Sequence, residues 1–183
     1  KPQFVDNFRP SQSTQAGLVR RLGKSGVEAI YLAAGDDDVA LIGRNLIEFR
    51  EMGYDVSGFD LMPESVAHVR ERGIDDVHVH DLGQPWPVED KSLKAVVLLD
   101  VLEHVEFPVE VLGHVKKALA DDGAVIITVP AYPWLFSRWD EQLGHFRRYT
   151  TREFRRHAAE AGFRVDWLNH GNRFTLPAAM AVR

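Results

Sequence analysis

Short apolar runs rich in Val and Ile alternate along the chain with longer segments of helical period. Buried strands of a parallel sheet have continuous apolar runs, whereas helices that cover a sheet repeat their apolar positions every three or four residues. Six strands are predicted, at Val27–Ala33, Tyr54–Phe59, Val77–His80, Ala95–Asp100, Gly123–Pro130 and Arg164–Leu168. The alternation predicts helices that connect parallel strands.

Five helices are predicted between these strands, at Gln12–Leu22, Gly43–Met52, Pro63–Arg72, Pro108–Ala120 and Thr151–Ala161. Pro is favoured in the first turn of a helix and Gly just after the last turn. Pro63 marks one helix start, and four glycines mark helix ends: Gly53, Gly73, Gly123 and Gly162. We therefore expect an α/β fold with a Rossmann-like, doubly wound, mostly parallel sheet in three α/β/α layers, formed by a single domain over residues 1–183.

Composition narrows the class of protein and of partner. Of the 183 residues, 45% are hydrophobic and 27% are charged, which is typical of a globular domain. The 22 Lys and Arg against 27 Asp and Glu leave a net charge of −5, which argues against a nucleic-acid partner because phosphate binding favours a basic surface. The apolar runs are too short to cross a bilayer. We expect a cytoplasmic protein with neither a nucleic-acid nor a membrane partner.

The absence of Cys excludes thiolate nucleophiles and Cys-based zinc sites. His78, His80 and Asp81 have the alternate spacing with which a strand could ligate a metal ion. No acidic motif accompanies them, and two partly exposed His side chains on a strand account for the same pattern. The sequence therefore predicts no metal site.

Polar residues follow the predicted strands at the end where doubly wound sheets bind ligands. They are Gly35 and Asp36–Asp38 after the first strand, Asp60 after the second, Asp81 after the third, Asp100 and His104 after the fourth, and Tyr132 and Trp134 after the fifth. An Asp about 20 to 25 residues beyond a Gly turn is placed to accept hydrogen bonds from the two hydroxyls of an adenosine ribose. Asp60 fits that description, or it satisfies free backbone N–H groups where the next helix opens. Asp81 by itself is equally a turn residue.

Several segments resemble the class I S-adenosylmethionine-dependent methyltransferases that act on small molecules. They are Gly43–Leu46 with Val56–Asp60, Asp81–Pro87, Leu98–Val105 and Leu119–Pro130, and the run Asp140–Thr150 is similar to a signature in one subgroup of these enzymes. The resemblance covers nearly the whole chain and implies the family's fold and S-adenosylmethionine as cofactor. It also implies a seventh, antiparallel strand near the C-terminus. No segment matches that strand, so we expect the domain to lack it or to be truncated before it.

The resemblance implies roles for individual residues. The cofactor site would comprise Gly35, Asp60, Leu61, Asp81, Leu82 and Asp100, and the substrate site Tyr132, Trp134, Arg147, Arg148 and Tyr149. Arg147 and Arg148 could pair with a carboxylate or phosphate of the acceptor, or instead cap the last helix. Trp134, Phe136 and Trp139 form either an apolar lid or wall, or part of the core. If a general base is needed, His145 is the first candidate and His104 the second, because imidazole titrates near neutral pH.

The chain departs from the family at the turn after the first strand. There the family has an acidic residue and a Gly-rich turn, whereas this chain has Ala33 and keeps Gly35 and Gly43 alone. The acidic run Asp36–Asp38 either contacts the cofactor's ammonium group or forms a solvated loop in a protein without a cofactor. We predict methyl transfer to a small-molecule acceptor, because the other strand ends keep the resemblance. A non-catalytic, methyltransferase-like binding or partner subunit is the alternative.

Overall fold

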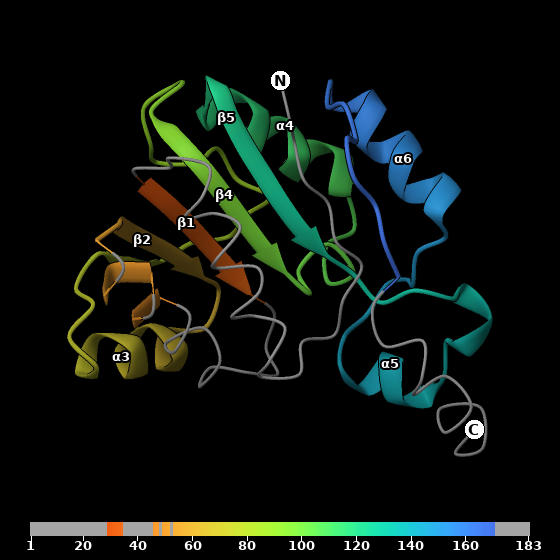
Figure 1. The fold of residues 1–183 in the computed structure, drawn as a ribbon. Coiled ribbons are helices and arrows are strands. Elements are labelled where there is room, and N and C mark those ends of the chain that lie inside the picture. Colours follow the sequence, from red (N-terminus) through yellow and green to blue (C-terminus); the bar gives the residue numbers. More distant parts are fainter. Residues whose placement is uncertain (1–28, 35–45, 48, 52, 171–183) are drawn as a thin grey trace.

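A computed structural model describes residues 29–34, 46–47, 49–51 and 53–170 of the chain. Its sheet contains β1 (Ala29–Ala34), β2 (Asp55–Asp60), β3 (Val77–Val79), β4 (Leu93–Leu99) and β5 (Leu119–Thr128). These strands stand in the order β3-β2-β1-β4-β5, and all neighbouring pairs are parallel (Figure 1). Five of the six predicted strands and the doubly wound sheet are therefore confirmed.

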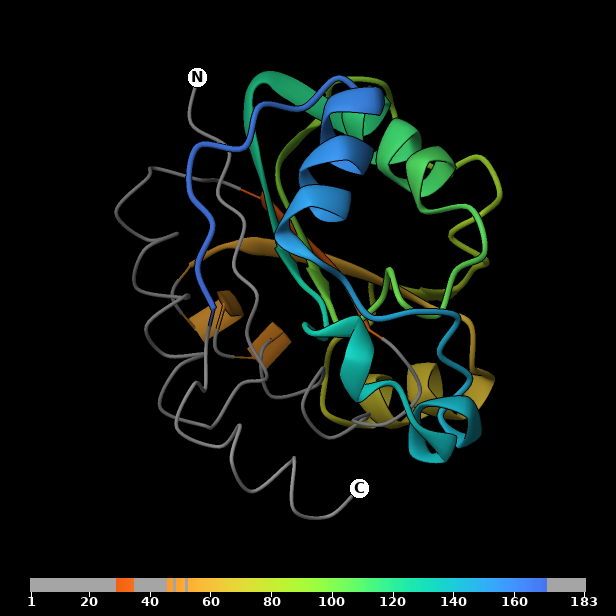
Figure 2. The same cartoon turned by 90° about the vertical axis from the view of Figure 1, so that its right-hand side faces the viewer.

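Helices cover both faces of this sheet (Figure 2). One face carries α4 (Pro108–Ala118) and α6 (Thr151–Glu160). The other carries α3 (Pro63–Glu71) and the helical residues 46–47 and 49–51. The three predicted layers are confirmed by this arrangement.

Two short helices, η1 (Pro133–Leu135) and α5 (Arg138–Gln142), follow β5. The predicted helix at Gln12–Leu22 lies outside the described residues, and the one at Gly43–Met52 lies partly outside them. Within the described part of the chain, no helix combines the length and the apolar character needed to cross a bilayer.

The inner strand β4, which lies between β1 and β5, divides its side chains between two hydrophobic clusters. Val96 and Leu98 pack on the side of α4 and α6, whereas Val97 and Leu99 pack on the side of α3. Successive side chains of a strand point to opposite faces, so a strand covered on both sides has apolar residues at every position. Each fully buried Val or Leu contributes about 1.5–3 kcal/mol to folding. The continuous apolar run that predicted this strand thus reflects burial on both faces.

Glycine was expected to end four helices, and the structure confirms this at three of them. Gly53, Gly73 and Gly162 have φ values of 88°, 82° and 79°, in the left-handed region that favours glycine. The prediction for Gly123 is wrong, because α4 ends at Ala118 and Gly123 lies inside β5. A Cβ at Gly123 would lie 3.0 Å from the carbonyl oxygens of Ala120 and of Leu93 on the neighbouring strand. The glycine therefore permits a close backbone approach, at an irregularity in the pairing of β4 with β5.

The sixth predicted strand, Arg164–Leu168, is also wrong. Residues 163–166 have no regular secondary structure, and Trp167 forms an isolated bridge only. Val165 and Leu168 pack against the hydrophobic cluster beneath α4 and α6. Their apolar character therefore reflects packing against the core without a ladder of backbone hydrogen bonds.

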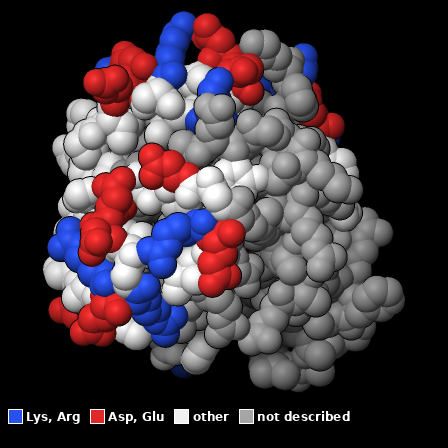
Figure 3. Space-filling model, turned by 60° about the vertical axis from the view of Figure 1, so that its left-hand side comes forward, with Lys and Arg blue, Asp and Glu red and all other residues white. Residues whose placement is uncertain are grey.

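On the side of the molecule that carries α3, acidic and basic side chains of the described residues are mixed (Figure 3). Exposed ion pairs also join Lys91 to Asp121 at 3.0 Å and Lys94 to Asp122 at 3.2 Å. Exposed pairs of this kind each contribute less than about 1 kcal/mol. The stability of the fold therefore depends chiefly on the two hydrophobic clusters.

The strand order reverses between β1 and β4, which are neighbours although β2 and β3 intervene in the chain. Ligands of doubly wound sheets bind beyond the carboxyl ends of the strands at such a reversal. The connection that contains α5 lies beyond the arrowheads of β4 and β5 (Figure 1). Residues that end these strands and residues of this connection therefore form the candidate site.

Candidate functional site

The carboxylate of Asp60 ends β2 and is buried, with 6% of the residue exposed. Its Oδ1 accepts a hydrogen bond of 2.7 Å from the backbone N–H of Met62, two residues later. Met62, and not Asp60, occupies the N-cap position of α3. The carboxylate thus forms the turn that opens the helix, and Leu61 between the two is left 61% exposed.

Asp81 follows β3, the strand that pairs with β2. Its Oδ1 accepts a hydrogen bond of 2.9 Å from the backbone N–H of Gly83, so the residue forms a turn of the same kind. The carbonyl of Leu82 accepts a hydrogen bond of 3.2 Å from the indole of Trp86. Both predicted residues therefore lie in one tight turn beside the end of β2.

Asp100 directly follows β4 and has a φ of 49°, which is rare for a residue other than Gly. Its backbone N–H donates to the carbonyl and to the hydroxyl of Thr128, the last residue of β5, at 3.1 and 3.0 Å. Tyr132, beyond the end of β5, has a φ of 64°. Strained backbone of this kind clusters at functional sites. The remaining predicted cofactor residue, Gly35, lies outside the described residues, as do Asp36–Asp38 and Gly43.

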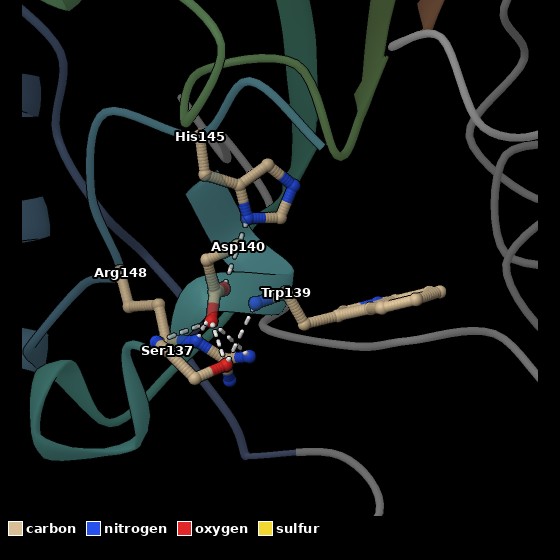
Figure 4. Close-up of polar contacts among 5 residues, drawn as sticks. All are labelled: Ser137, Trp139, Asp140, His145 and Arg148. Atoms are coloured by element: carbon tan, nitrogen blue, oxygen red, sulfur yellow. Dashed lines mark hydrogen bonds and ion pairs between the residues drawn. The ribbon is translucent and has the colours of Figure 1, made fainter. Parts of the chain in front are cut away.

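Asp140, in α5, is fully buried and gathers several donors around one carboxylate (Figure 4). Arg148 donates to it from Nε at 2.6 Å and from Nη2 at 3.1 Å, and the backbone N–H of Ser137 donates at 2.9 Å. The Nδ1 atom of His145 lies 3.1 Å from its Oδ1. Burial by itself would raise the pKa of Asp140, but the hydrogen bonds from Arg148, Ser137 and His145 outweigh it and hold the pKa below its ordinary value.

The two His residues predicted as catalytic lie against each other. The rings of His104 and His145 meet edge to face, with centroids 4.6 Å apart. His145 is 8% exposed, and its Nδ1 faces Asp140, which leaves Nε2 turned away from that carboxylate (Figure 4). His104 comes from the loop after β4, so two segments 41 positions apart in the sequence contribute one pair of imidazoles.

Three hydrogen bonds hold the segment around His145 on the loop after β4. The N–H of Phe146 donates to the carbonyl of Glu103 at 2.7 Å, Arg147 donates from Nη2 to the carbonyl of Glu106 at 2.8 Å, and the Tyr149 hydroxyl donates to the carbonyl of Leu102 at 3.1 Å. Tyr149 is 1% exposed, and burial raises the pKa of its hydroxyl. Arg147, Arg148 and Tyr149 therefore make structural contacts, and their predicted role toward an acceptor stays a prediction.

The connection after β5 carries several aromatic side chains. The rings of Tyr132 and Trp134 lie 5.9 Å apart, and Trp134 and Trp139 are 47% and 62% exposed. Of the two predicted alternatives, wall or core, this exposure favours the wall.

Asp140 and Glu103 are missed by the predictions drawn from sequence. Glu103 is 1% exposed and stands beside His104 in a segment that carries the family resemblance. For Asp140 a local signal exists: Ser137 three residues earlier forms a capping box with it at the start of α5. That signal predicts a helix start, and the contacts with His145 and Arg148 appear only in the tertiary structure.

The comparisons with known proteins agree with this geometry. Residues 41–167, which are more than half of the chain, match a family model described as a methyltransferase domain. No curated protein matched the chain.

Solved structures also share this fold. A chain of the complex between the Haloferax volcanii Trm112 methyltransferase activator and a methyltransferase is similar at a TM-score of 0.60 and 19% identity, over 82% of this chain and 73% of that chain. A SAM-dependent methyltransferase from Aquifex aeolicus has a TM-score of 0.56 and 16% identity, over 85% and 90%. Phosphoethanolamine N-methyltransferase 2 from Haemonchus contortus has a TM-score of 0.65 and 20% identity, over 83% and 37%.

At these identities the solved structures establish the fold. The family model covers the segments that carry the resemblance in the sequence. They run from Gly43 to the end of β5 and include the run Asp140–Thr150. These segments supply the strand ends and the connection described above. On both grounds the chain belongs to the class I S-adenosylmethionine-dependent methyltransferase family.

Proposed function

We propose that this protein transfers a methyl group from S-adenosylmethionine to a small-molecule acceptor. One observation carries the proposal: the carboxyl edge of the sheet has buried Asp60 at the end of β2 and the His104–His145 pair beyond the ends of β4 and β5. A methyltransferase needs a cofactor site and an acceptor site side by side. Asp60 and the His104–His145 pair both lie at the carboxyl edge of the sheet, where doubly wound sheets bind ligands.

The residues at the ends of β2 and β3 fit the adenosine part of this cofactor. One oxygen of Asp60 holds the N–H of Met62, and a carboxylate has further lone pairs with which to accept the ribose hydroxyls. Leu61 is 61% exposed next to it and offers an apolar contact to a flat base. Asp81 and Leu82 border the same place from the neighbouring strand.

When bound, S-adenosylmethionine supplies a methyl group on a positively charged sulfur. The protein's task is then to hold the acceptor in line with that group, and positioning alone can lower the barrier by up to about 7–11 kcal/mol. Asp140 contacts Nδ1 of His145 and so fixes the ring, which leaves Nε2 as the nitrogen for contact with an acceptor. An imidazole held in this way can accept the acceptor's proton or bind its polar group.

The small-molecule acceptor is proposed from one structural neighbour and from the exposed aromatic wall. The Haemonchus contortus enzyme is in complex with phosphomonomethylethanolamine and S-adenosylhomocysteine. In the present chain, Tyr132 and Trp134 pack against each other after β5, and the exposed Trp139 lies in α5 next to Asp140. Aromatic faces bind an acceptor's apolar or cationic part.

The test is calorimetric titration of the purified protein with S-adenosylmethionine and with S-adenosylhomocysteine. Asp60→Asn keeps an oxygen for the N–H of Met62 but removes the charge, so we expect at least a tenfold loss of affinity, about 1.4 kcal/mol. The matched control is Asp75→Asn, an exposed residue that precedes β3 at the opposite edge of the sheet. Equal affinity in all three proteins would remove Asp60 from the cofactor site.

A non-catalytic, methyltransferase-like binding or partner subunit is the other candidate, because this chain has Ala33 and the acidic run Asp36–Asp38 where the family has an acidic residue and a Gly-rich turn. That candidate predicts that neither ligand binds to the folded protein. Binding of both ligands at micromolar concentration would reject it.

A further inference from the structure

Three side chains of kinds that bind metal ions meet beyond the end of β4. Glu103, His104 and His145 each offer one ligand atom, and these atoms lie within 4.8 Å of one another. The sequence predicts no metal site, and Glu103 and His104 lie 41 or more positions away from His145, so no local spacing joins the three. The fold alone brings them together.

The group mixes two imidazoles with one carboxylate. Imidazole and carboxylate ligands together suit divalent transition metals such as Zn²⁺, Mn²⁺ and Fe²⁺. Three protein ligands also leave positions open for water or substrate, which is the pattern of catalytic rather than structural sites. Ligand atoms around Zn²⁺ lie about 3.3–3.6 Å apart, so small side-chain rotations would complete the site.

The surroundings hold these ligands in place. The hydrogen bond of 2.7 Å from the N–H of Phe146 to the carbonyl of Glu103 joins the two segments directly beside the ligands. Asp140 Oδ1 lies 3.1 Å from Nδ1 of His145, which leaves Nε2, the nitrogen that does not face Asp140, to act as the ligand atom (Figure 4). A carboxylate behind a His ligand is the usual outer contact of a protein metal site, where it fixes the ring and raises its basicity. Arg148 in turn fixes Asp140 through two hydrogen bonds.

Two of the three side chains in this cluster are buried. Glu103 is 1% exposed and His145 is 8% exposed. The ligand atoms that lie within 4.8 Å of one another are therefore largely shielded from solvent. We propose that Glu103, His104 and His145 bind one divalent transition-metal ion, with an open coordination position for a polar atom of the acceptor.

Metal binding stands on the three side chains alone, whereas the clause about the acceptor rests on the proposed function. If the protein transfers methyl groups, the bound ion would lower the pKa of an acceptor hydroxyl group. The ion would then replace the imidazole base in promoting loss of the acceptor's proton. His145 would then be a ligand, and Asp140 a positioning residue behind it.

The experiment uses protein without a His tag, stripped with a chelator, and titrated calorimetrically with Zn²⁺. Co²⁺ is added in a parallel titration because its visible spectrum reports the coordinating atoms. We expect one ion per chain, and at least a 100-fold loss of affinity in Glu103→Gln and in His145→Gln. His68→Gln, a His on α3 whose side chain is 41% exposed, is the matched control and should bind as the parent does. An absent Zn²⁺ signal, or equal affinity in Glu103→Gln and the parent, would overturn the proposal.

A milder variant keeps the proposal testable if those substitutions unfold the chain. Asp140→Asn retains the shape of the side chain and removes its charge, and loss of an outer contact typically weakens metal binding 10–100-fold with stoichiometry unchanged. Unchanged affinity would contradict the positioning role. S-adenosylmethionine is titrated into the same stripped protein to separate the two proposals. A protein that binds S-adenosylmethionine but not Zn²⁺ overturns the metal site alone. A protein that binds Zn²⁺ but not S-adenosylmethionine overturns the methyl-transfer function alone.

Discussion

Two regions of the candidate site are built in different ways. At the ends of β2 and β3, Asp60 and Asp81 each bind a backbone N–H two residues later. Beyond β5, the segment Asp140–Tyr149 is held by hydrogen bonds that span 41 residues, from Arg147 to Glu106, and 47 residues, from Tyr149 to Leu102. We call these the turn region and the latch region.

The comparison separates robust local geometry from geometry that depends on the whole fold. An Asp that binds an N–H two residues on forms its turn with little help from the rest of the chain. The latch region exists only when α5, the loop after β4 and the hydrophobic cluster are all assembled. Substitutions should therefore affect folding far more in the latch region than in the turn region.

The largest effect is expected for Asp140→Ala. It leaves the guanidinium of Arg148, whose side chain is 16% exposed, without its buried carboxylate partner, and it frees the ring of His145. Removal of one partner from a buried ion pair costs about 3–5 kcal/mol. Urea unfolding should report this loss, whereas Asp121→Ala, which removes an exposed pair with Lys91, should cost less than about 1 kcal/mol. Equal costs for the two variants would contradict the distinction between the regions.

Tyr149→Phe tests the long-range hydrogen bond to Leu102 alone. The variant keeps the ring, which packs against Phe154 at 6.1 Å, and leaves a buried carbonyl without its donor. We expect a loss of about 1–2 kcal/mol in the free energy of unfolding. Tyr132→Phe, at a partly exposed residue, provides the comparison and should be close to neutral.

A local contact near the latch region should show a smaller, pH-dependent effect. Hydrogen bonds from the side chain and backbone of Thr150 lower the pKa of Glu153 below its ordinary value of 4.5. A carboxylate with a depressed pKa adds stability that is complete above pH 4.5 and is lost as the pH falls through the lowered value. Unfolding followed between pH 6 and pH 3 should show this loss, and Glu153→Gln should remove it. Because Glu153 is exposed, the change should stay below about 1 kcal/mol; an identical pH profile in both proteins would exclude this contribution.

The smallest effect on folding is expected for Asp81→Ala in the turn region. The side chain is exposed and, among the described residues, accepts a hydrogen bond from Gly83 alone, so the free energy of unfolding should change by less than about 0.5 kcal/mol. Affinity for S-adenosylmethionine should nevertheless fall under the proposed function. A large loss of stability would show that the turn region is less local than its hydrogen bonds indicate.

Much of the fold could be predicted, because burial leaves a direct trace in the sequence. The run at β4 is apolar at every position since both faces are covered, and Gly73 and Gly162 end helices in a conformation that other residues resist. The wrong predictions fall where one sequence pattern has two possible structural causes. Val165 and Leu168 are apolar because they pack on the core outside any strand, and Gly123 lies at a close backbone approach inside β5 instead of after a helix.

By itself the sequence determined the order of the five strands and of α3, α4 and α6, the family, and the turns that place Asp60 and Asp81 at one edge of the sheet. These features depend on neighbours within a few positions or on a periodic apolar pattern, and both can be recognised along the chain. Only the tertiary structure decided that Asp140 orients His145, and that Glu103 and His104 meet that ring. Contacts between segments some 40 residues apart follow from the packing of strands and loops in space, and no local pattern of residue types encodes that distance.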